Sequence, residues 1–206
     1  NADDLRVSGG ACAVRSKRRG FSLQKRADAY CEAGSAYIRC GKSYAKAFDV
    51  REMSIIGLHN VQNAMTALLL VQGLYEKKGL EFPVAKAAAA CCSFKGLAHR
   101  MEKLGEFKGR LFINDSKATT VGAVEMALRS LDRPAVLILG GRAKGDDYSR
   151  LIPSIEEKVR ALVLIGETKA EFSEIFGQFT RAEAADLDEA CLKAMELSHD
   201  GDAVLL

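Results

Sequence analysis

The first part of the chain alternates short apolar runs with polar breaks. Residues 36–40 and 44–48 carry aromatic or β-branched side chains on either side of Gly41-Lys42-Ser43, and similar runs recur through residues 5–56. Runs of this kind joined by a glycine-containing break are typical of hairpins. We therefore expect antiparallel strand pairs in this part of the protein.

Two helices are expected next. Apolar residues between His59 and Leu74 lie nearly all round a helical projection, which predicts a buried helix, and Asn60 stands where an N-cap is expected. The alanine-rich residues 84–92 predict a second helix, which is broken at residues 94–97. We place a domain boundary at this break, which gives domains 1–97 and 98–206.

Beyond residue 97 one unit recurs: a short apolar run, a polar or glycine-containing turn, and an amphipathic stretch. Such alternation of strand and helix predicts an α/β domain, Rossmann-like, with a mostly parallel sheet and helices on both faces. Ligands of open sheets of this kind bind beyond the carboxyl ends of the strands. The predicted strands are residues 111–113, 135–139, 161–165 and 203–206, and helical spacing recurs at 121–131 and 190–197.

Composition narrows the class of protein. A net charge of +3 over 206 residues gives no reason to expect a nucleic-acid partner, and no apolar run approaches the ~20 residues of a membrane span. The six cysteines include no C-x-x-C pair, which favours a reduced, cytoplasmic protein. The chain begins without Met and ends inside an apolar run, so we expect it to be part of a longer protein. The sequence gives no indication of the oligomeric state.

A relaxed phosphate-loop pattern occurs at residues 36–43, with alanine in place of the first glycine. A phosphate loop must open directly into a helix whose N–H groups face the phosphates. Here both flanks are β-like, so we interpret Gly41 as part of a hairpin turn and reject phosphate binding.

Three polar clusters carry candidate chemistry. Asn60 and Asn63 can cap the first helix or contact a nucleotide base or phosphate. Arg100 can hold a phosphate, or can form a surface ion pair with Glu102, and His99 beside it is interpreted as an orienting residue. The sharpest cluster is Asn114-Asp-Ser-Lys-Ala-Thr-Thr120, at the end of a predicted strand.

That third cluster supplies several kinds of group. Lys117 is a cation, Asp115 accepts hydrogen bonds from hydroxyls, and Thr119 or Thr120 can cap the next helix or hold a carboxylate. Residues 139–147 follow the next predicted strand, where glycines admit a close approach of the backbone and Lys144 can reach an anion. Both clusters belong at the crevice of the predicted sheet.

In this order the clusters resemble the Mur ligase family. The likeness runs along nearly the whole chain and is carried most specifically by Asn-Asp-Ser-Lys-Ala-Thr at 114–119, with His-Asn-x-x-Asn at 59–63, His-Arg-x-Glu at 99–102 and Gly-Gly-x-x-Lys-Gly at 140–145. The pattern is that of the members that add D-glutamate to UDP-N-acetylmuramoyl-L-alanine. Two positions depart from it: Thr120 stands where asparagine is frequent, and Arg142-Ala143 replaces Asp-Gly.

The resemblance implies an ATP-dependent ligase of peptidoglycan synthesis that forms an acyl phosphate, which the D-glutamate amine then attacks. It implies that Asn60 and Asn63 contact the ATP base. By the same likeness, Arg100 and Asp115 contact the ribose and phosphates, and Lys117 is the catalytic cation at the phosphoryl region. Thr119 and Lys144 are expected to hold D-glutamate.

The resemblance also implies what lies elsewhere. Residues 1–97 would be the carboxy-terminal part of an ATP-binding central domain, whose phosphate loop and Mg²⁺ ligands precede residue 1, so we expect no metal site in this chain. We expect this chain alone to be inactive, and residues 98–206 to fold independently. Two alternatives stay open: a folate-polyglutamate synthase relative, against which Asn114-Asp-Ser-Lys117 argues, and a non-enzymatic dinucleotide-binding module, although no G-x-G-x-x-G follows any strand.

Overall fold

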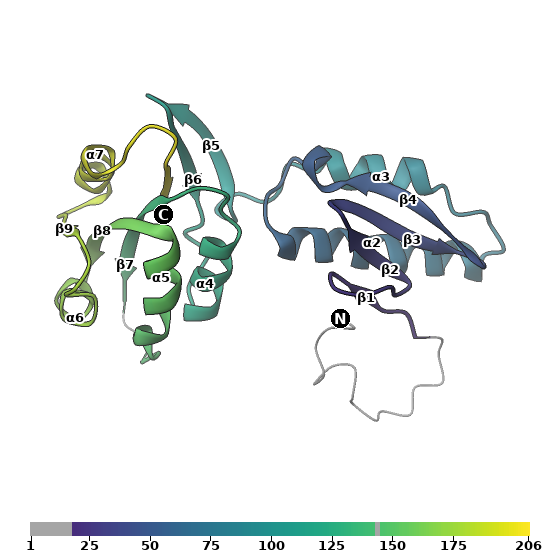
Figure 1. Ribbon diagram of the computed structural model, residues 1–206, viewed down its shortest axis with the longest axis horizontal. Coiled ribbons are helices and arrows are strands. Elements are labelled where there is room, and N and C mark those ends of the chain that lie inside the picture. Colours follow the sequence, from purple (N-terminus) through teal and green to yellow (C-terminus); the bar gives the residue numbers. More distant parts are fainter. Residues whose placement is uncertain (1–17, 143–144) are drawn as a thin grey trace. The chain divides into compact units, whose positions relative to one another are not determined.

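The computed structural model describes residues 18–142 and 145–206, which form two compact units divided between Lys95 and Gly96. This division lies two residues before the boundary predicted from the sequence. Figure 1 shows a first unit of hairpins and two long helices and a second unit of alternating strands and helices. None of the helices in the described ranges is long and apolar enough to cross a membrane.

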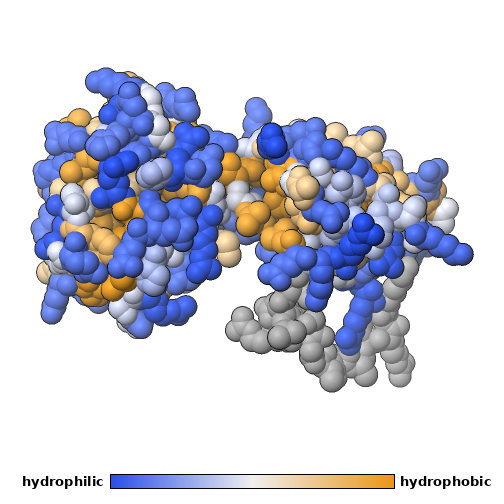
Figure 2. All heavy atoms as spheres, viewed as in Figure 1, coloured by the Kyte–Doolittle hydropathy of each residue, from blue (hydrophilic) through white to orange (hydrophobic). Residues whose placement is uncertain are grey.

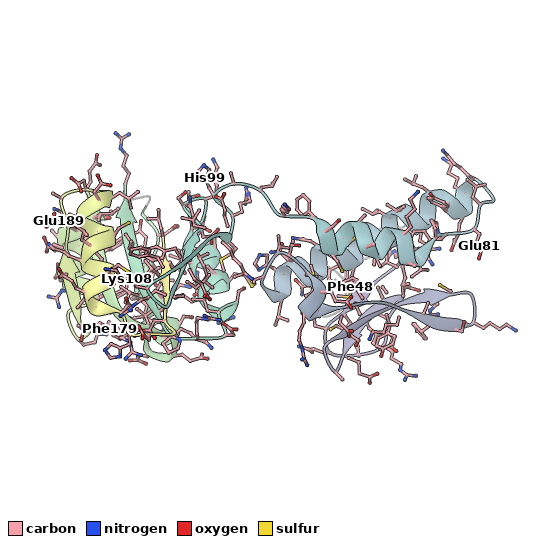
Figure 3. The ribbon with its side chains drawn as sticks, turned by 90° about the horizontal axis from the view of Figure 1, so that it is seen from above. Phe48, Glu81, His99, Lys108, Phe179 and Glu189 are labelled. Carbon is pink, nitrogen blue, oxygen red and sulfur yellow. The ribbon has the colours of Figure 1, made fainter. Side chains whose placement is uncertain are left out.

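The first unit is a four-stranded sheet with two helices on one face (Figures 1 and 3). The sheet order is β1-β2-β3-β4; β2, β3 and β4 are antiparallel, and the short β1 runs parallel to β2. Gly41, with φ of 63°, forms the turn between β3 and β4, so the expected hairpin is confirmed and the phosphate-loop pattern has no helix after it. The elements are β1 (Phe21–Ser22), β2 (Ala29–Glu32), β3 (Ser35–Cys40), β4 (Ser43–Asp49), the 3-10 turn η1 (Val50–Glu52), α2 (Leu58–Lys77) and α3 (Val84–Ser93).

The core of this unit lies between the sheet and its helices. Alternate strand residues point to the same face, so Ala36 and Ile38 of β3 meet Met65 and Leu68 of α2 in one buried cluster. Phe48, labelled in Figure 3, joins them from β4. The apolar side chains at every second strand position therefore pack against the apolar side chains that recur with the helical period of α2.

Two expectations about α2 were wrong. Its N-cap is Gly57, so Asn60 lies inside the first turn. The helix is also not buried on all sides, because Leu70 and Leu74 are 66% and 59% exposed. A helix that is apolar all round needs a partner on each side, and among the described residues the sheet covers only one side of α2.

The second unit confirms the predicted α/β class. Its six-stranded sheet has the order β5-β6-β10-β7-β8-β9, in which every neighbouring pair is parallel except the β5–β6 hairpin. The elements are β5 (Glu102–Phe107), β6 (Arg110–Asn114), α4 (Val121–Arg129), β7 (Ala135–Gly141), η2 (Tyr148–Leu151), α5 (Ile152–Lys158), β8 (Val159–Gly166), α6 (Lys169–Ile175), β9 (Arg181–Glu183), α7 (Leu187–Leu197) and β10 (Ala203–Leu205).

Helices cover both faces of this sheet. Val136, Val163 and Val204 pack with Ala190 and Ala194 of α7 on one face. The residues next to them along the strands point to the other face. On that face α5 contacts β8, and α4 contacts α5. The buried strands read as continuous apolar runs because each face is covered.

The last strand, β10, lies in the middle of the sheet, and a buried carboxylate precedes it. Asp202 is 2% exposed; its carboxylate accepts hydrogen bonds from Arg160 Nε at 2.6 Å and Nη2 at 3.2 Å, and from the His199 backbone N–H at 2.8 Å. Burial acts to raise the pKa of Asp202, but the hydrogen bonds from Arg160 and His199 outweigh it and lower the pKa overall. The start of β10 is thereby tied to β8.

Candidate functional site

The carboxyl ends of the parallel strands meet at one edge of the second unit. β6 ends at Asn114, β7 at Gly141, β8 at Gly166 and β10 at Leu205. The backbone N–H of Asp115 donates to the carbonyl of Leu206 at 2.6 Å, so the polar segment after β6 starts beside the end of β10. This is the edge where open α/β sheets bind ligands.

The segment from Asp115 to Thr120 folds into a turn that begins α4. The Ala118 N–H donates to the Asp115 carbonyl at 2.7 Å, and the Thr120 hydroxyl accepts a bond of 3.3 Å from the Ala123 N–H. Thr120 is therefore the N-cap of α4. Of the two threonines, Thr120 satisfies the helix end.

Two cations are brought to this edge. The backbone N–H of Lys117 donates to the carbonyl of His99 at 3.1 Å, which places Arg100 and Lys117 on adjoining segments. Both residues are exposed, and neither side chain has a hydrogen bond or ion pair within the described ranges. The alternative ion pair of Arg100 with Glu102 does not form, because the Glu102 carboxylate accepts from the His99 backbone N–H at 2.8 Å. Two neighbouring cations without carboxylate partners are suited to binding an anion.

A pocket of about 240 Å³ opens at the same edge of the sheet, between the ends of β6, β7 and β8. Thr119 lines it, and the Thr168 hydroxyl beneath it donates to the Gly141 carbonyl at 3.4 Å. Tyr148 and Phe172 form an apolar wall, with their rings edge to face at a centroid distance of 4.9 Å. The volume and mixed lining fit a small amino acid. Lys144, expected here from the sequence, lies outside the described residues.

Gly140 is required by the sheet itself. A Cβ on Gly140 would lie 2.1 Å from the carbonyl oxygen of Ile165, much closer than van der Waals contact allows. The close backbone approach that we expected of this glycine is therefore an approach of β7 to β8. Gly141 follows with φ of 125°, a conformation that residues with a Cβ rarely adopt.

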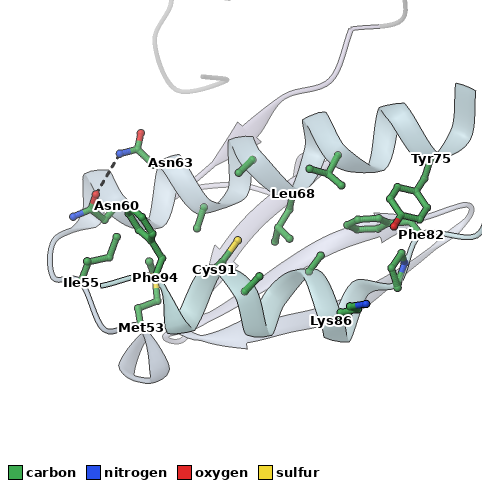
Figure 4. Close-up of a pocket in the computed structure, with 16 residues that line it drawn as sticks. Met53, Ile55, Asn60, Asn63, Leu68, Tyr75, Phe82, Lys86, Cys91 and Phe94 are labelled. Atoms are coloured by element: carbon green, nitrogen blue, oxygen red, sulfur yellow. Dashed lines mark hydrogen bonds between the residues drawn. The ribbon is translucent and has the colours of Figure 1, made fainter. Parts of the chain in front are cut away.

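In the first unit, Asn60 and Asn63 stand at one end of an apolar groove of about 540 Å³ between α2 and α3 (Figure 4). Asn60 donates through Nδ2 to the Ile56 carbonyl at 2.7 Å and accepts through Oδ1 from Asn63 Nδ2 at 3.3 Å. The carboxamide of Asn60 is thus engaged on both sides. Asn63 is exposed and keeps its carbonyl oxygen and one N–H available within the described part of the chain.

The predicted site residues fall into two groups, one in each unit. Arg100, Asp115, Lys117 and Thr119 lie at the carboxyl edge of the second unit, whereas the asparagine pair belongs to the first unit. The sequence did not lead us to three residues that line the pocket: Tyr148, Thr168 and Phe172. Of these, Thr168 could have been found, because it is a polar residue just after the end of β8. Within residues 18–142 and 145–206, no three His, Cys, Asp or Glu side chains are grouped to hold a metal ion.

Most of the visible surface of the second unit is hydrophilic, with apolar residues showing between the charged ones (Figure 2). The candidate site itself is defined by the polar groups after β6 and by the 240 Å³ pocket.

Residues 99–206, just over half of the chain, match the family model described as "Mur ligase, glutamate ligase domain". The chain is 41% identical over 189 residues to UDP-N-acetylmuramoylalanine–D-glutamate ligase of Chromobacterium violaceum, covering 90% of this chain and 40% of that protein. It is 37% identical over 212 residues to the enzyme of the same name from Geotalea daltonii, covering 100% and 44%. The chain thus spans about two fifths of the length of these curated relatives.

Solved structures show the same fold at low identity. A bifunctional folylpolyglutamate synthase/dihydrofolate synthase from Yersinia pestis aligns with a TM-score of 0.64 at 17% identity, covering 86% of this chain and 41% of that one. UDP-N-acetylmuramate-alanine ligase from Thermotoga maritima aligns with a TM-score of 0.60 at 15% identity, covering 91% and 43%. The family match and the curated relatives lead to one conclusion: the chain belongs to the Mur ligase family.

Proposed function

We propose that this chain is part of a cytoplasmic, ATP-dependent ligase that adds D-glutamate to UDP-N-acetylmuramoyl-L-alanine in peptidoglycan synthesis. The observation that carries the proposal is the pair of exposed cations, Arg100 and Lys117, joined through the backbone bond from Lys117 N–H to the His99 carbonyl. The names of the relatives that are 41% and 37% identical support the same substrates.

The chemistry requires cations at this edge. The substrate carboxylate, the ATP phosphates and the incoming amino acid are all anionic, so their approach is repulsive without opposite charge. Arg100 and Lys117 would offset this repulsion and stabilise the transferring phosphoryl group, which forms an acyl phosphate with the substrate. Lys117 is the residue that we assign to catalysis.

The remaining residues would bind and orient. Asp115 would accept hydrogen bonds from the ribose hydroxyls, and Thr119, which lines the 240 Å³ pocket, would hold D-glutamate together with Lys144. The D-glutamate amine would attack the acyl carbon, and phosphate would leave. The rings of Tyr148 and Phe172, which line the pocket, would limit the access of water, which otherwise hydrolyses an acyl phosphate.

In the first unit, Asn63 would read the adenine of ATP. Its available carbonyl oxygen and N–H match the donor and acceptor on the N6/N7 edge of adenine. Asn60 would orient Asn63, because its own carboxamide is engaged with Ile56 and Asn63. The two asparagines therefore have different roles in this proposal.

The family likeness implies that the phosphate loop and the Mg²⁺ ligands of the intact protein precede residue 1. We therefore expect the 206-residue chain alone to release no phosphate above background when given ATP, D-glutamate and the UDP-linked substrate.

Steady-state kinetics of the intact ligase test the proposal. Lys117→Ala should lower kcat by about 100-fold or more, the usual effect of removing one group that stabilises transition-state charge. Lys108→Ala is the matched control, because Lys108 is an exposed lysine that lies before β6, whereas Lys117 follows it. A K117A enzyme within threefold of wild type, or a wild type that extends folate with glutamate and ignores the UDP-linked substrate, would overturn the assignment.

A further inference from the structure

The segment that carries Arg100 has an unusual backbone. His99 and Met101, on either side of Arg100, have φ values of 64° and 46°, in the left-handed region. Neither is glycine, and such residues are held there only when surrounding contacts compensate for the strain. Figure 3 labels His99 at the periphery of the second unit.

Two carboxylates hold this segment. The Glu102 Oε2 atom accepts from the His99 backbone N–H at 2.8 Å, and the Asp115 Oδ1 atom accepts from the Met101 backbone N–H at 2.9 Å. Each bond joins an ionised acceptor to the N–H of a left-handed residue, and charge-assisted bonds are about twice as strong as neutral ones.

Further contacts fix the other sides of the turn. The His99 carbonyl accepts from Lys117 N–H at 3.1 Å, and the His99 ring Nδ1 lies 2.9 Å from Asn114 Nδ2. The Met101 side chain is buried, with 5% exposure. The backbone of residues 99–101 is therefore fixed, while the Arg100 side chain stays exposed between its two anchors.

Glu102 and Arg100 therefore have different roles: Glu102 holds the backbone, and Arg100 is exposed to a ligand. A carboxylate two residues from an arginine on a surface can form an ion pair with it, which would neutralise the guanidinium. Here the same carboxylate is used by the backbone, so the turn is held and the guanidinium keeps its charge for another anion. The direction in which Arg100 leaves the backbone is set by the left-handed residues on both sides.

We propose that Glu102 is a positioning residue for nucleotide binding: by holding His99 in the left-handed conformation it keeps Arg100 beside Lys117, where both meet the ATP phosphates. This inference rests on the proposed function, because it takes ATP as the anion. If Glu102 only stabilised the fold, its removal would lower stability and leave the KM for ATP unchanged.

The experiment compares four forms of the intact ligase: wild type, Glu102→Ala, His99→Gly/Glu102→Ala and Glu106→Ala. E102A should raise the KM for ATP about tenfold, since a misplacement of about 1 Å in a binding group costs up to ~100-fold. The KM for D-glutamate should change less than twofold. Glu106 is the matched control, an exposed glutamate of the same strand whose side chain makes no hydrogen bond or ion pair in the described part of the chain.

The double variant tests the conformational step directly. Glycine adopts positive φ without a carboxylate to hold it, so H99G should restore most of the ATP affinity lost in E102A. A merely structural role, or a direct contact of Glu102 with ATP, predicts no such rescue. Hydrogen exchange of the 206-residue chain checks that β6 and β7 amides stay protected. If they do not, Glu102→Met replaces E102A, because methionine keeps a similar side-chain length and has no oxygen to accept the His99 N–H.

Each outcome decides the matter. A raised KM for ATP that H99G restores supports the positioning role. An E102A enzyme (or E102M, where it is used) that matches E106A, or a raised KM that H99G leaves unchanged, overturns it. If the wild-type ligase itself does not consume ATP, the proposed function fails first, and this result is distinct from the other two.

Discussion

Replacing Gly140 with alanine probes how tightly the strands at the crevice are packed. Gly140 pairs with Ile165 between β7 and β8, just before the chain turns into the candidate pocket. An added Cβ would lie 2.1 Å from the Ile165 carbonyl oxygen and 2.7 Å from its Cγ1 atom. The clash is mainly with backbone, which no change of rotamer can relieve.

The size of the effect follows from this geometry. Cβ atoms essentially never approach other heavy atoms closer than 3.0 Å, so the strands must separate by about 1 Å at this pair. Overpacking of a well-filled interior costs about 1–3 kcal/mol, and a backbone clash of this depth belongs at the upper end, ~3 kcal/mol. Gly122→Ala is the control, because that glycine lies in α4 with nothing within 4 Å of the added Cβ. G122A should be neutral or stabilise by up to about 1 kcal/mol.

The assay is urea unfolding of the 206-residue chain, followed by circular dichroism, with hydrogen exchange of the β7 and β8 amides to assign the loss to the second unit. G140A should unfold about 3 kcal/mol more easily than G122A, and exchange should increase along both strands. If the two variants differ by less than about 1 kcal/mol, the close approach of β7 to β8 does not constrain the crevice and the reasoning fails.

Three further predictions concern the second unit. Asp202→Asn should lower stability by about 1–3 kcal/mol at pH 7. The pKa of Asp202 is lowered in the folded state, so the ionised carboxylate contributes to the free energy of unfolding above the unfolded pKa of about 3.9, and this contribution is lost as pH falls through the folded pKa. The unfolding free energies of D202N and wild type, measured by urea titration, should therefore converge in acid. A constant difference down to pH 2 would contradict this. Thr120→Ala should cost about 1 kcal/mol through loss of the α4 cap, while Thr120→Ser should stay within about 0.5 kcal/mol of wild type in the same unfolding assay. Limited trypsin digestion, cutting at Lys95, should leave a stable carboxy-terminal piece seen by mass spectrometry, and its rapid degradation would argue against an independently folding second unit.

The buried strands of the second unit could be predicted from the sequence because parallel strands covered on both faces are continuous apolar runs. β7 and β8 fall on such runs, and so does the central strand β10. The polar run after β6 was also a clear signal, because Asp115, Ser116 and Lys117 follow a strand directly and cannot contribute to an apolar core. Pattern and burial agree at these positions.

Elements at the edges of the sheet could not be predicted in the same way. β5 reads Glu-Lys-Leu-Gly-Glu-Phe and β9 reads Arg-Ala-Glu, and neither has an apolar face that a pattern would show. α5 and α6 have seven residues each, about two turns, which is too short for a helical period to stand out. These elements are defined by the neighbours against which they pack.

The candidate site also combines residues that the sequence predicts with residues that it does not. Lys117 and Thr119 belong to one continuous motif and were found from it, whereas Tyr148 and Phe172 reach the pocket from later turns. The left-handed backbone at Met101 has no local signal at all, because it depends on a carboxylate fourteen positions along the chain. Contacts set by tertiary structure are beyond what a local pattern can show.

The central place of β10 has a consequence for the newborn protein. Val204 is paired with Phe112 of β6 on one side and with Val136 of β7 on the other, so β10 joins two strands that leave the ribosome much earlier. Until β10 is synthesised, β6 and β7 each have an unpaired backbone edge in the middle of the sheet, where strands of other chains can pair. A ribosome that stalls before residue 203 therefore releases a product prone to aggregation.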